Sequence, residues 1–243
     1  GNQQQEAQYI AQRVLELREE GMSFTEMAVL FRAAFHSQAL EFELMKRDIP
    51  YEYRGGLKFF ERAHVKDVVS HLRIKLNPRD EIAWMRILGL QPGIGLVTAQ
   101  KVAKQVQEIE SLDEIVDAEL KVPKRAQAGW ESLLRTLKKM VAEELPADLI
   151  RVVTAGDYRD YLEAEYPDFM DRLDDLEQFA LFAEGYSELK KFLDEVSLSS
   201  DYGAIREQDG SYEEEKMVLS TVHQAKGLEW DTVFIINLVD GKF

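Results

Sequence analysis

Two short apolar runs near the end of the chain, Met217–Thr221 and Thr232–Ile236, most constrain its fold. Both are rich in β-branched residues and too short for helices, so they predict buried strands. The loop between them carries a hydroxyl, an imidazole, an ammonium group, a glycine and a carboxylate. Because α/β proteins place ligand contacts in loops that follow buried strands, the pattern predicts an α/β fold with a candidate site here. The alternative is an ordinary connection whose polar residues face water.

The composition bounds the class of protein. A chain of 243 residues with 45% hydrophobic and 31% charged residues is typical of a soluble globular protein of one large or two modest domains. It contains no cysteine, which excludes disulfides, thiolate nucleophiles and cysteine-ligated zinc, and fits a reducing cytoplasm. No apolar run approaches membrane-spanning length, and the first residues are polar rather than signal-like. We therefore expect a cytoplasmic protein that does not span a membrane.

The charge is unevenly distributed. The net charge of −15 argues against a protein that simply coats nucleic acid, since phosphate binding needs local positive charge. Residues 146–201 hold 5 Lys/Arg against 15 Asp/Glu, whereas residues 97–139 hold 8 against 7. The acidic excess is best explained as a solvated helix face. A surface formed by the earlier segment could still meet DNA.

The first part of the chain alternates helical and extended patterns. Glu6–Glu20 has the spacing of an amphipathic helix ended by glycine, and Met27–Phe31 predicts a buried strand. Ser37–Lys46 predicts a second helix, and Ile49–Tyr53 a short extended piece. Gly55-Gly56 follows; because no Lys-Ser/Thr comes after it, a tight turn is favoured over a phosphate loop.

The segment Gln91–Val102 has the pattern of a hairpin followed by a helix. Two glycines around an apolar residue allow a tight turn, and free backbone N–H groups at a helix N-terminus can hold a phosphate. Lys101 and Lys104 lie one turn apart and could add charge. The alternative is a Gly-Pro helix connection with solvated lysines.

Helical patterns fill the rest of the middle. Residues 111–144 support two or three helices, in which Lys121, Lys124 and Arg125 are interpreted as a solvated helix start. Pro146 and Pro167 each fit the first turn of a further helix, and the pattern from Pro167 onward is interrupted near Gly185. Residues 201–215 are polar and read as a linker or loop.

Several of these segments resemble one protein family. Residues 221–229 read Thr-x-His-x-Ala-Lys-Gly-Leu-Glu and are followed by Trp230. This pattern resembles the fifth helicase motif of the UvrD/Rep/PcrA branch of superfamily 1 DNA helicases. The stretch from Ala28 to Arg62, with its strand, helix, short strand and Gly-Gly, resembles the fourth motif and its sequel, and Gly93-Ile94-Gly95 resembles the hairpin of the family's inserted helical domain. Residues 171–176 and 189–198 resemble the closing helix of that insert.

The resemblance implies a fold and its division. It implies an α/β protein in which a RecA-like parallel sheet domain is interrupted by a mostly α-helical inserted domain with a helix-hairpin-helix-like element. Residues 1–76 and 202–243 would form the second RecA-like domain, without its end, and residues 77–201 the insert. The resemblance covers nearly the whole chain but only part of a family protein.

The resemblance also implies roles for single residues. Arg32 would point at the γ-phosphate of ATP, and a rigid, always-charged guanidinium suits a transferring phosphoryl group. Glu229 would accept hydrogen bonds from the ATP ribose, and Lys226 and Gly227 would shape a loop that joins nucleotide to DNA. Thr221 and His223 would meet the single-strand backbone. The expected duplex contacts are Gly93, Ile94, Gly95, Thr98 and Lys101.

The implied activity belongs to a larger protein. The sequence holds no Gly-x-x-x-x-Gly-Lys-Ser/Thr phosphate loop and no recognisable acidic motif for Mg²⁺. We therefore expect a piece of an ATP-dependent, 3′-to-5′ DNA helicase that uses ATP with Mg²⁺ and does not hydrolyse ATP alone. Expected partners are single- and double-stranded DNA and the first RecA-like domain of the same polypeptide, in a monomer.

Three other readings stay open at this point. The parent could be a helicase-nuclease subunit of the RecB or AddA type, whose motifs are similar. The chain could also be a non-catalytic DNA-docking or interaction module that kept the fold and lost the ATPase. A structure-specific helix-hairpin-helix protein would rest on Gly93–Thr98 alone and leaves both α/β segments unexplained.

Overall fold

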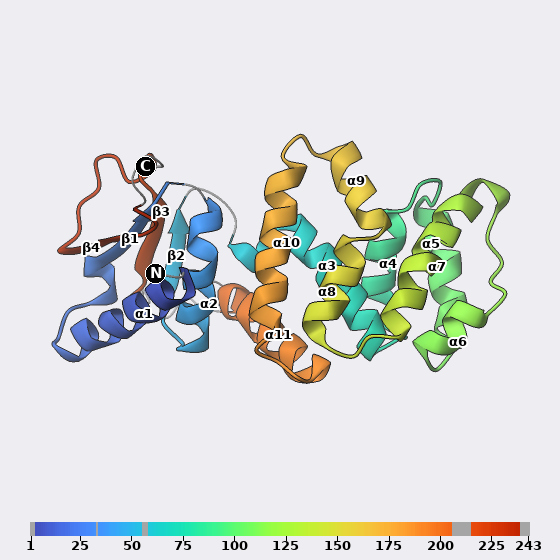
Figure 1. The fold of residues 1–243 in the computed structure, drawn as a ribbon, viewed down its shortest axis with the longest axis horizontal. Helices are drawn as coiled ribbons and strands as arrows, with labels where there is room; N and C mark the ends of the chain where they lie inside the picture. The colour runs from blue at the N-terminus through green and yellow to red at the C-terminus, as the bar shows by residue number, and fades with distance from the viewer. Residues whose placement is uncertain (1–2, 33, 55–57, 206–214, 239–243) are drawn as a thin grey trace. The chain divides into compact units, whose positions relative to one another are not determined.

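A computed structural model describes residues 3–32, 34–54, 58–205 and 215–238 (Figure 1). Its contacts divide the chain into two compact units. The sheet unit comprises residues 1–62 and 199–243, and the helical unit comprises residues 63–198. The domain boundaries predicted from the sequence, after residues 76 and 201, stay predictions.

The sheet unit is built on a four-stranded, fully parallel sheet in the order β2-β3-β1-β4. Its central pair joins a strand from the start of the chain to one from the end, with Ala28 opposite Val218 and Phe31 opposite Thr221. The predicted α/β class with a parallel sheet is thereby confirmed. The elements are α1 (Gln3–Glu19), η1 (Phe24–Glu26), β1 (Met27–Phe31), η2 (Ala34–Ser37), α2 (Gln38–Lys46), β2 (Tyr51–Arg54), η3 (Phe59–Glu61), β3 (Met217–Thr221) and β4 (Thr232–Ile235).

One face of the sheet carries the apolar core. Side chains alternate across a strand, so Met27, Val29 and Phe31 of β1 share a face with Leu219 of β3. These residues are fully buried against apolar positions of α1 and α2. Those helix positions recur at helical spacing: Ala7, Ile10, Ala11, Val14 and Leu17 on α1, and Leu40 and Leu44 on α2.

The two terminal strands differ in burial. β3 is buried along Met217–Ser220, as predicted. The prediction of a buried strand is wrong for β4, because Val233 and Ile235 are 42% and 44% exposed. β4 pairs only with β1 and lies at the edge of the sheet, so its outer positions lack a neighbouring strand. The apolar run alone could not distinguish a central from an edge strand.

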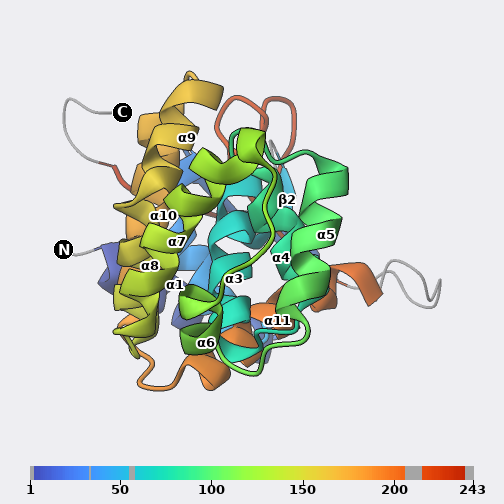
Figure 2. The same cartoon turned by 90° about the vertical axis from the view of Figure 1, so that its right-hand side faces the viewer.

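The helical unit consists of nine α-helices and one 3₁₀ turn among the residues that the structure describes (Figure 2). Pro146 occupies the first turn of its helix, as predicted. The same prediction is wrong for Pro167, because that helix starts two residues later with Asp168 at its N-cap position. The elements are α3 (Ala63–Leu76), α4 (Glu81–Gly89), α5 (Leu96–Val106), α6 (Leu112–Asp117), η4 (Lys124–Ala126), α7 (Gln127–Val141), α8 (Pro146–Thr154), α9 (Asp157–Glu165), α10 (Phe169–Ala183) and α11 (Leu189–Ile205), which continues past this unit.

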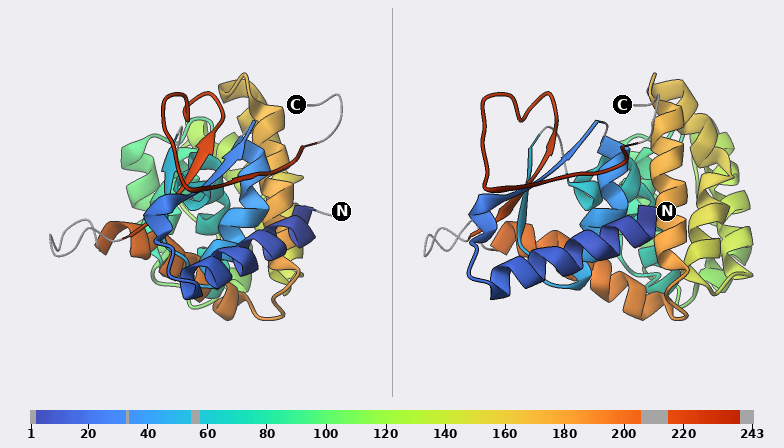
Figure 3. Two further views of the ribbon diagram at one scale, coloured as in Figure 1. Left: turned by 90° about the vertical axis from the view of Figure 1, so that its left-hand side faces the viewer. Right: turned by 60° about the vertical axis from the view of Figure 1, so that its left-hand side comes forward.

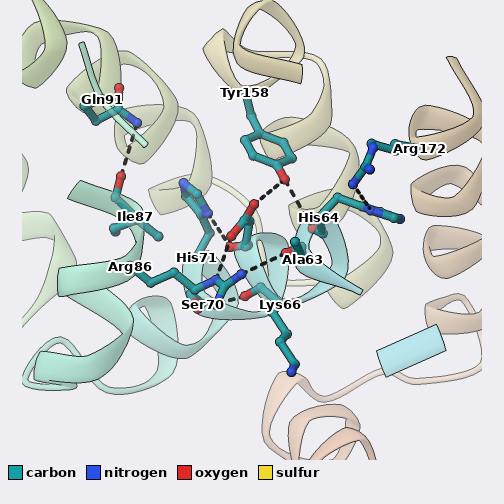
Figure 4. Close-up of polar contacts among 11 residues, drawn as sticks. Ala63, His64, Lys66, Ser70, His71, Arg86, Ile87, Gln91, Tyr158 and Arg172 are labelled. Atoms are coloured by element: carbon teal, nitrogen blue, oxygen red, sulfur yellow. Dashed lines mark hydrogen bonds and ion pairs between the residues drawn. The ribbon is translucent and has the colours of Figure 1, made fainter. Parts of the chain in front are cut away.

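A network of buried polar groups, here called the α3 network, links four helices of this unit (Figure 4). Asp67 on α3 is 3% exposed and accepts hydrogen bonds from Arg86 Nε on α4 at 2.6 Å and from Tyr158 Oη on α9 at 2.7 Å. Arg86 also donates to the Ala63 carbonyl at 3.1 Å. The Nδ1 atom of His71 lies 2.8 Å from the backbone carbonyl oxygen of Asp67, within hydrogen-bond distance. A charge-assisted cluster thus fixes the start of α3 to α4 and α9.

The second half of the α3 network reaches α10. His64 Nε2 lies 2.8 Å from an Asp175 carboxylate oxygen, and its Nδ1 lies 3.2 Å from Arg172 Nη1. Because an arginine can only donate, Nδ1 accepts and Nε2 carries the proton that is donated to Asp175. The Arg172 guanidinium also stacks 3.8 Å above the centre of the Tyr166 ring.

None of the helices in the described part of the chain has the length and apolar character needed to span a membrane.

Candidate functional site

The first candidate site lies where β1 and β3 end side by side. Phe31 is opposite Thr221, and the Val222 N–H donates to the Phe31 carbonyl at 3.0 Å, so pairing continues to the last residue of each strand. Arg32 follows directly and its side chain is exposed. Parallel strands place their carboxyl ends at one edge of a sheet, where ligands bind in open α/β folds. Two sequence segments far apart in the chain therefore share one edge.

The loop after β3 begins with a tight helical turn. The N–H groups of Gln224 and Ala225 both donate to the Thr221 carbonyl at 3.0 Å, and Gln224 N–H also lies 3.4 Å from Thr221 Oγ1. Ala225 is buried and its carbonyl accepts from Leu228 N–H at 3.0 Å. Gly227 closes the turn with a φ of +85°, a conformation that favours glycine. The turn is built by the backbone, which leaves its side chains available.

The predicted contact residues of this loop point outward. His223, Lys226 and Glu229 are exposed, and Thr221 is half-buried. Figure 3 shows the loop arching away from the end of β3 before the chain returns to β4. The loop thus exposes an imidazole, an ammonium group and a carboxylate. Their contact with a nucleotide or with DNA stays a prediction.

The strand register places two predicted nucleotide contacts, Arg32 and Glu229, toward opposite ends of β1. Arg32 lies beyond the carboxyl end of β1, whereas Glu229 comes three residues before Thr232, which pairs with Met27 at the other end of β1. Strand pairing therefore brings Arg32 next to Thr221 and Val222 rather than next to Glu229. A nucleotide shared by Arg32 and Glu229 stays a prediction.

A histidine and a buried carboxylate of the sheet unit have shifted pKa values. The pKa of His36 is lowered, chiefly by burial and then by the Arg32 charge, while Glu6 acts in the opposite direction. Glu41 is 2% exposed and accepts hydrogen bonds from Ser37 Oγ at 2.9 Å, Tyr51 Oη at 3.2 Å and Phe59 N–H at 3.1 Å. Burial nevertheless raises the pKa of Glu41, with the Arg62 charge opposing the shift. This carboxylate braces η3 rather than facing solvent.

The second candidate site is the hairpin between α4 and α5. Ile94 N–H donates to the Gln91 carbonyl at 3.2 Å, and the Gly95 carbonyl accepts from the N–H groups of Thr98 and Ala99 at 2.9 Å each. Gly93 has a φ of +77°, so the chain reverses through a left-handed residue. Gly95 sits at the N-cap position of α5 without a capping side chain. Its neighbours' N–H groups are the kind that bind an anion at a helix N-terminus.

The five predicted duplex contacts of the hairpin differ in access. Gly93, Gly95 and Lys101 are exposed. Ile94 and Thr98 are 5% and 3% exposed, so their support for binding would come from holding the hairpin's shape. All five lie within one turn-and-helix unit, and a direct DNA contact by any of them stays a prediction.

Sequence reasoning missed what packs against the hairpin. A Cβ on Gly93 would lie 2.2 Å from the Arg125 carbonyl oxygen, and one on Gly129 would lie 2.3 Å from the Pro92 carbonyl oxygen. The hairpin backbone is therefore in direct contact with the chain entering α7. Gly129 within a helical pattern was the available signal, because a helical glycine is unfavourable unless another backbone approaches closely.

A resident metal site is not evident. In the described parts of the chain, no three His, Asp or Glu side chains are arranged to hold a metal ion. The buried carboxylates Glu41, Asp67 and Asp175 are instead occupied by hydrogen-bond donors of the protein.

Comparison with known proteins gives the family. The chain is 29% identical to the ATP-dependent DNA helicase PcrA of Staphylococcus epidermidis over 255 residues, and 28% identical to that of Staphylococcus aureus over the same length. These alignments cover 98% of this chain but 34% of each relative, so the chain spans about a third of their length. The model of the UvrD-like helicase C-terminal domain matches residues 1–243, and the chain therefore belongs to the UvrD-like helicase C-terminal domain family.

Proposed function

We propose that this chain is part of an ATP-dependent 3′-to-5′ DNA helicase or translocase, in which the sheet unit forms one wall of the ATP cleft. The observation that supports this most is the pairing of Phe31 with Thr221, which sets Arg32 beside the loop of the fifth motif at one sheet edge. The family match and the helicase relatives agree with it. In this proposal the chain does not hydrolyse ATP alone, because its sequence holds no phosphate loop.

Arg32 is the proposed catalytic residue. A guanidinium stays charged at all relevant pH values and offers several N–H donors in a fixed plane. Placed at the end of a rigid central strand, it would meet the γ-phosphate and stabilise the charge that develops on the transferring phosphoryl group. Mg²⁺ bound with ATP would neutralise phosphate charge, with its ligands supplied outside this chain. Every step proposed for this chain rests on Arg32 and the loop alone.

The loop after β3 would couple ATP to DNA. In the proposal Thr221 and His223 meet the single-strand backbone, while Lys226, Gly227 and Glu229 face the nucleotide. A single short turn pinned at the Thr221 carbonyl carries both sets of groups, so displacing one set moves the other. Such a shared element is what reciprocal coupling between two ligands requires.

Two alternative functions remain to be separated by experiment. A helicase-nuclease parent of the RecB or AddA type would use the same two sites and differ only outside this chain. A non-catalytic DNA-docking module would keep the hairpin while Arg32 serves no phosphoryl transfer. The experiment below separates the second reading from a helicase.

The proposal is tested by replacing Arg32 with alanine in the native polypeptide that carries this chain. DNA-stimulated ATP turnover should fall by roughly 10³-fold, the lower end for arginines that act on a transferring phosphoryl group. Nucleotide binding, measured by fluorescence with a labelled ATP analogue, should stay within about threefold, because this role is largely confined to the transition state.

Arg54 provides the matched control. It ends β2, which lies on the other side of β3 from β1, opposite Ser220, and it pairs with Glu52 at 3.0 Å on a partly exposed surface. Arg54→Ala should leave turnover nearly unchanged. An Arg32→Ala protein that turns over ATP at the normal rate would remove the assigned role, and equal losses in both variants would indicate general damage to the sheet.

A further inference from the structure

Two segments of the helical unit concentrate positive charge on an otherwise acidic chain. Residues 91–107 and 120–130 together contain five Lys/Arg residues and no Asp or Glu, while the whole chain has a net charge of −15. The five are Lys101 and Lys104 on α5, and Lys121, Lys124 and Arg125 on the segment that leads into α7. We call residues 121–125 the basic strap.

The basic strap is fastened along α5 at both ends. At one end, Gln105 of α5 accepts from Lys121 N–H at 2.8 Å and donates to the Lys121 carbonyl at 3.3 Å. At the other end, the Arg125 carbonyl lies against Gly93 of the hairpin. The strap therefore runs from the last turn of α5 back to the hairpin that begins it, beside the helix (Figure 2). Lys101 lies one turn before Gln105, on the α5 face that meets the strap.

The side chains of all five basic residues are exposed. Among the residues that the structure describes, none of the five makes an ion pair. The strap's attachment uses backbone groups, so its three cationic side chains are left to solvent. Exposed cations that make no ion pair in the described residues, beside free N–H groups at a helix start, match the electrostatic footprint of a phosphate-backbone site.

We propose that the basic strap and α5 form one surface that binds the phosphate backbone of duplex DNA, with the hairpin at its end. The inference rests on the proposed function and adds Lys121, Lys124 and Arg125 to the expected contacts. Single strands are commonly bound by stacking bases on exposed aromatic rings. The two segments contain one aromatic residue, Trp130, and it is 5% exposed, so this surface offers cations without a stacking platform. A rigid duplex backbone fits it better.

The test uses the full chain and its K121A/K124A/R125A variant. Binding of a fluorescein-labelled blunt duplex and of an oligo-dT strand is followed by anisotropy over a range of salt concentrations. Each lost phosphate contact lowers the salt dependence of log K by about 0.9, so the variant's slope should fall by roughly 2 to 3, with at least about tenfold weaker duplex binding. Oligo-dT binding should change less. Circular dichroism melting shows whether the variants fold.

A control variant carries the same change in net charge elsewhere. Lys138, Lys139 and Lys190 are exposed and lie outside the two segments, so K138A/K139A/K190A should keep nearly the normal duplex affinity and slope. Equal losses in the two triple variants would reduce the effect to net charge and overturn the strap. Equal losses on duplex and oligo-dT would overturn the assignment to duplex DNA.

A second variant tests the strap's position rather than its charge. Gln105→Ala removes both side-chain bonds to Lys121 and leaves every cation in place. Duplex affinity should fall severalfold with little change in slope; unchanged affinity would show that the strap need not be held along α5. If the unmodified chain binds no duplex, the strap is overturned, while the proposed function is still decided by the Arg32 experiment on the native polypeptide. Normal duplex binding by the strap variant likewise overturns only the strap.

Discussion

The interior of the sheet unit and the interior of the helical unit are stabilised by different chemistry. The sheet unit packs an apolar face of the sheet, including Val29 and Leu219, against two helices. The helical unit also buries a charged and hydrogen-bonded cluster, the α3 network, in which Asp67 and Asp175 are 3% and 6% exposed. Apolar packing is tolerant of substitutions that conserve volume, whereas a buried charged cluster demands each partner. The two units should therefore respond differently to mutation and to pH.

The two candidate sites differ in how closely other backbone atoms approach their left-handed glycines. In the turn after β3, Gly227 has open space beside it, since a Cβ there would meet nothing within 4 Å. The hairpin is braced by the strap, since a Cβ on Gly93 would meet the Arg125 carbonyl at 2.2 Å. Of the two left-handed glycines, Gly227 thus lies in open space and Gly93 lies against another backbone segment. This suits a loop that couples two ligands and a hairpin that holds one backbone.

The largest expected effect comes from the centre of the α3 network. Asp67→Ala leaves Arg86 and Tyr158 without their carboxylate partner, and should destabilise the helical unit by about 3 kcal/mol. Urea unfolding followed by circular dichroism measures this. The control is Asp157→Ala, which breaks an ion pair with Arg135, 63% exposed, and should cost less than about 1 kcal/mol. Similar losses in both variants would show that the network is no more than a surface pair.

The next largest effect is a difference in stability between alanine substitutions at two glycines of one hairpin. Gly93→Ala must place a Cβ against the Arg125 carbonyl at a φ of +77°, and should cost about 1–3 kcal/mol. Gly95→Ala meets nothing within 4 Å and has a φ of −84°, so only the poorer N-cap preference of alanine counts, and stability should fall by less than about 1 kcal/mol. Thermal melting of both variants decides this. Gly95→Ala is therefore the cleaner substitution for DNA binding; equal destabilisation would contradict the contact between hairpin and strap.

The smallest expected effect is a pair of opposite pH trends. The lowered pKa of His71, caused by burial, means that its contribution to the helical unit is present above about pH 6.5 and is lost on acidification. The raised pKa of Glu41, also caused by burial, means that its contribution to the sheet unit is lost as pH rises above 4.5, the ordinary pKa of a glutamate carboxyl. Amide exchange, corrected for its intrinsic pH dependence, resolves the two units. His71→Gln and Glu41→Gln should each flatten one trend, and trends of the same sign would refute this reading.

Much of the fold followed from local patterns. The strands Met27–Phe31 and Met217–Thr221 were predicted within their observed bounds, because β-branched runs of that length have few other uses. Directly before β1, the structure forms a 3₁₀ turn capped by Ser23 and Glu26, an element too short to show helical periodicity in the sequence.

The remaining features depend on contacts that local patterns do not encode. His64 and His71 have no spacing in the sequence that predicts a shared site, yet they belong to one network with Asp67, Tyr158 and Asp175 from three helices. Lys121, Lys124 and Arg125 were interpreted as a solvated helix start. Their side chains are indeed exposed, but their backbone lies against α5 and the hairpin. Spacing identifies which face of a helix is apolar, but not which distant segment crosses it.

The strand order has a consequence for how this chain is made. β3 lies between β2 and β1, and β4 pairs with β1, so the two strands translated first have no direct pairing with each other. None of the strand pairings in the described sheet can form until the ribosome has synthesised the entire helical unit and reached β3, which begins at Met217. Assembly of the sheet is therefore a late, long-range event in biosynthesis, and the apolar face of β1 must be shielded in the meantime.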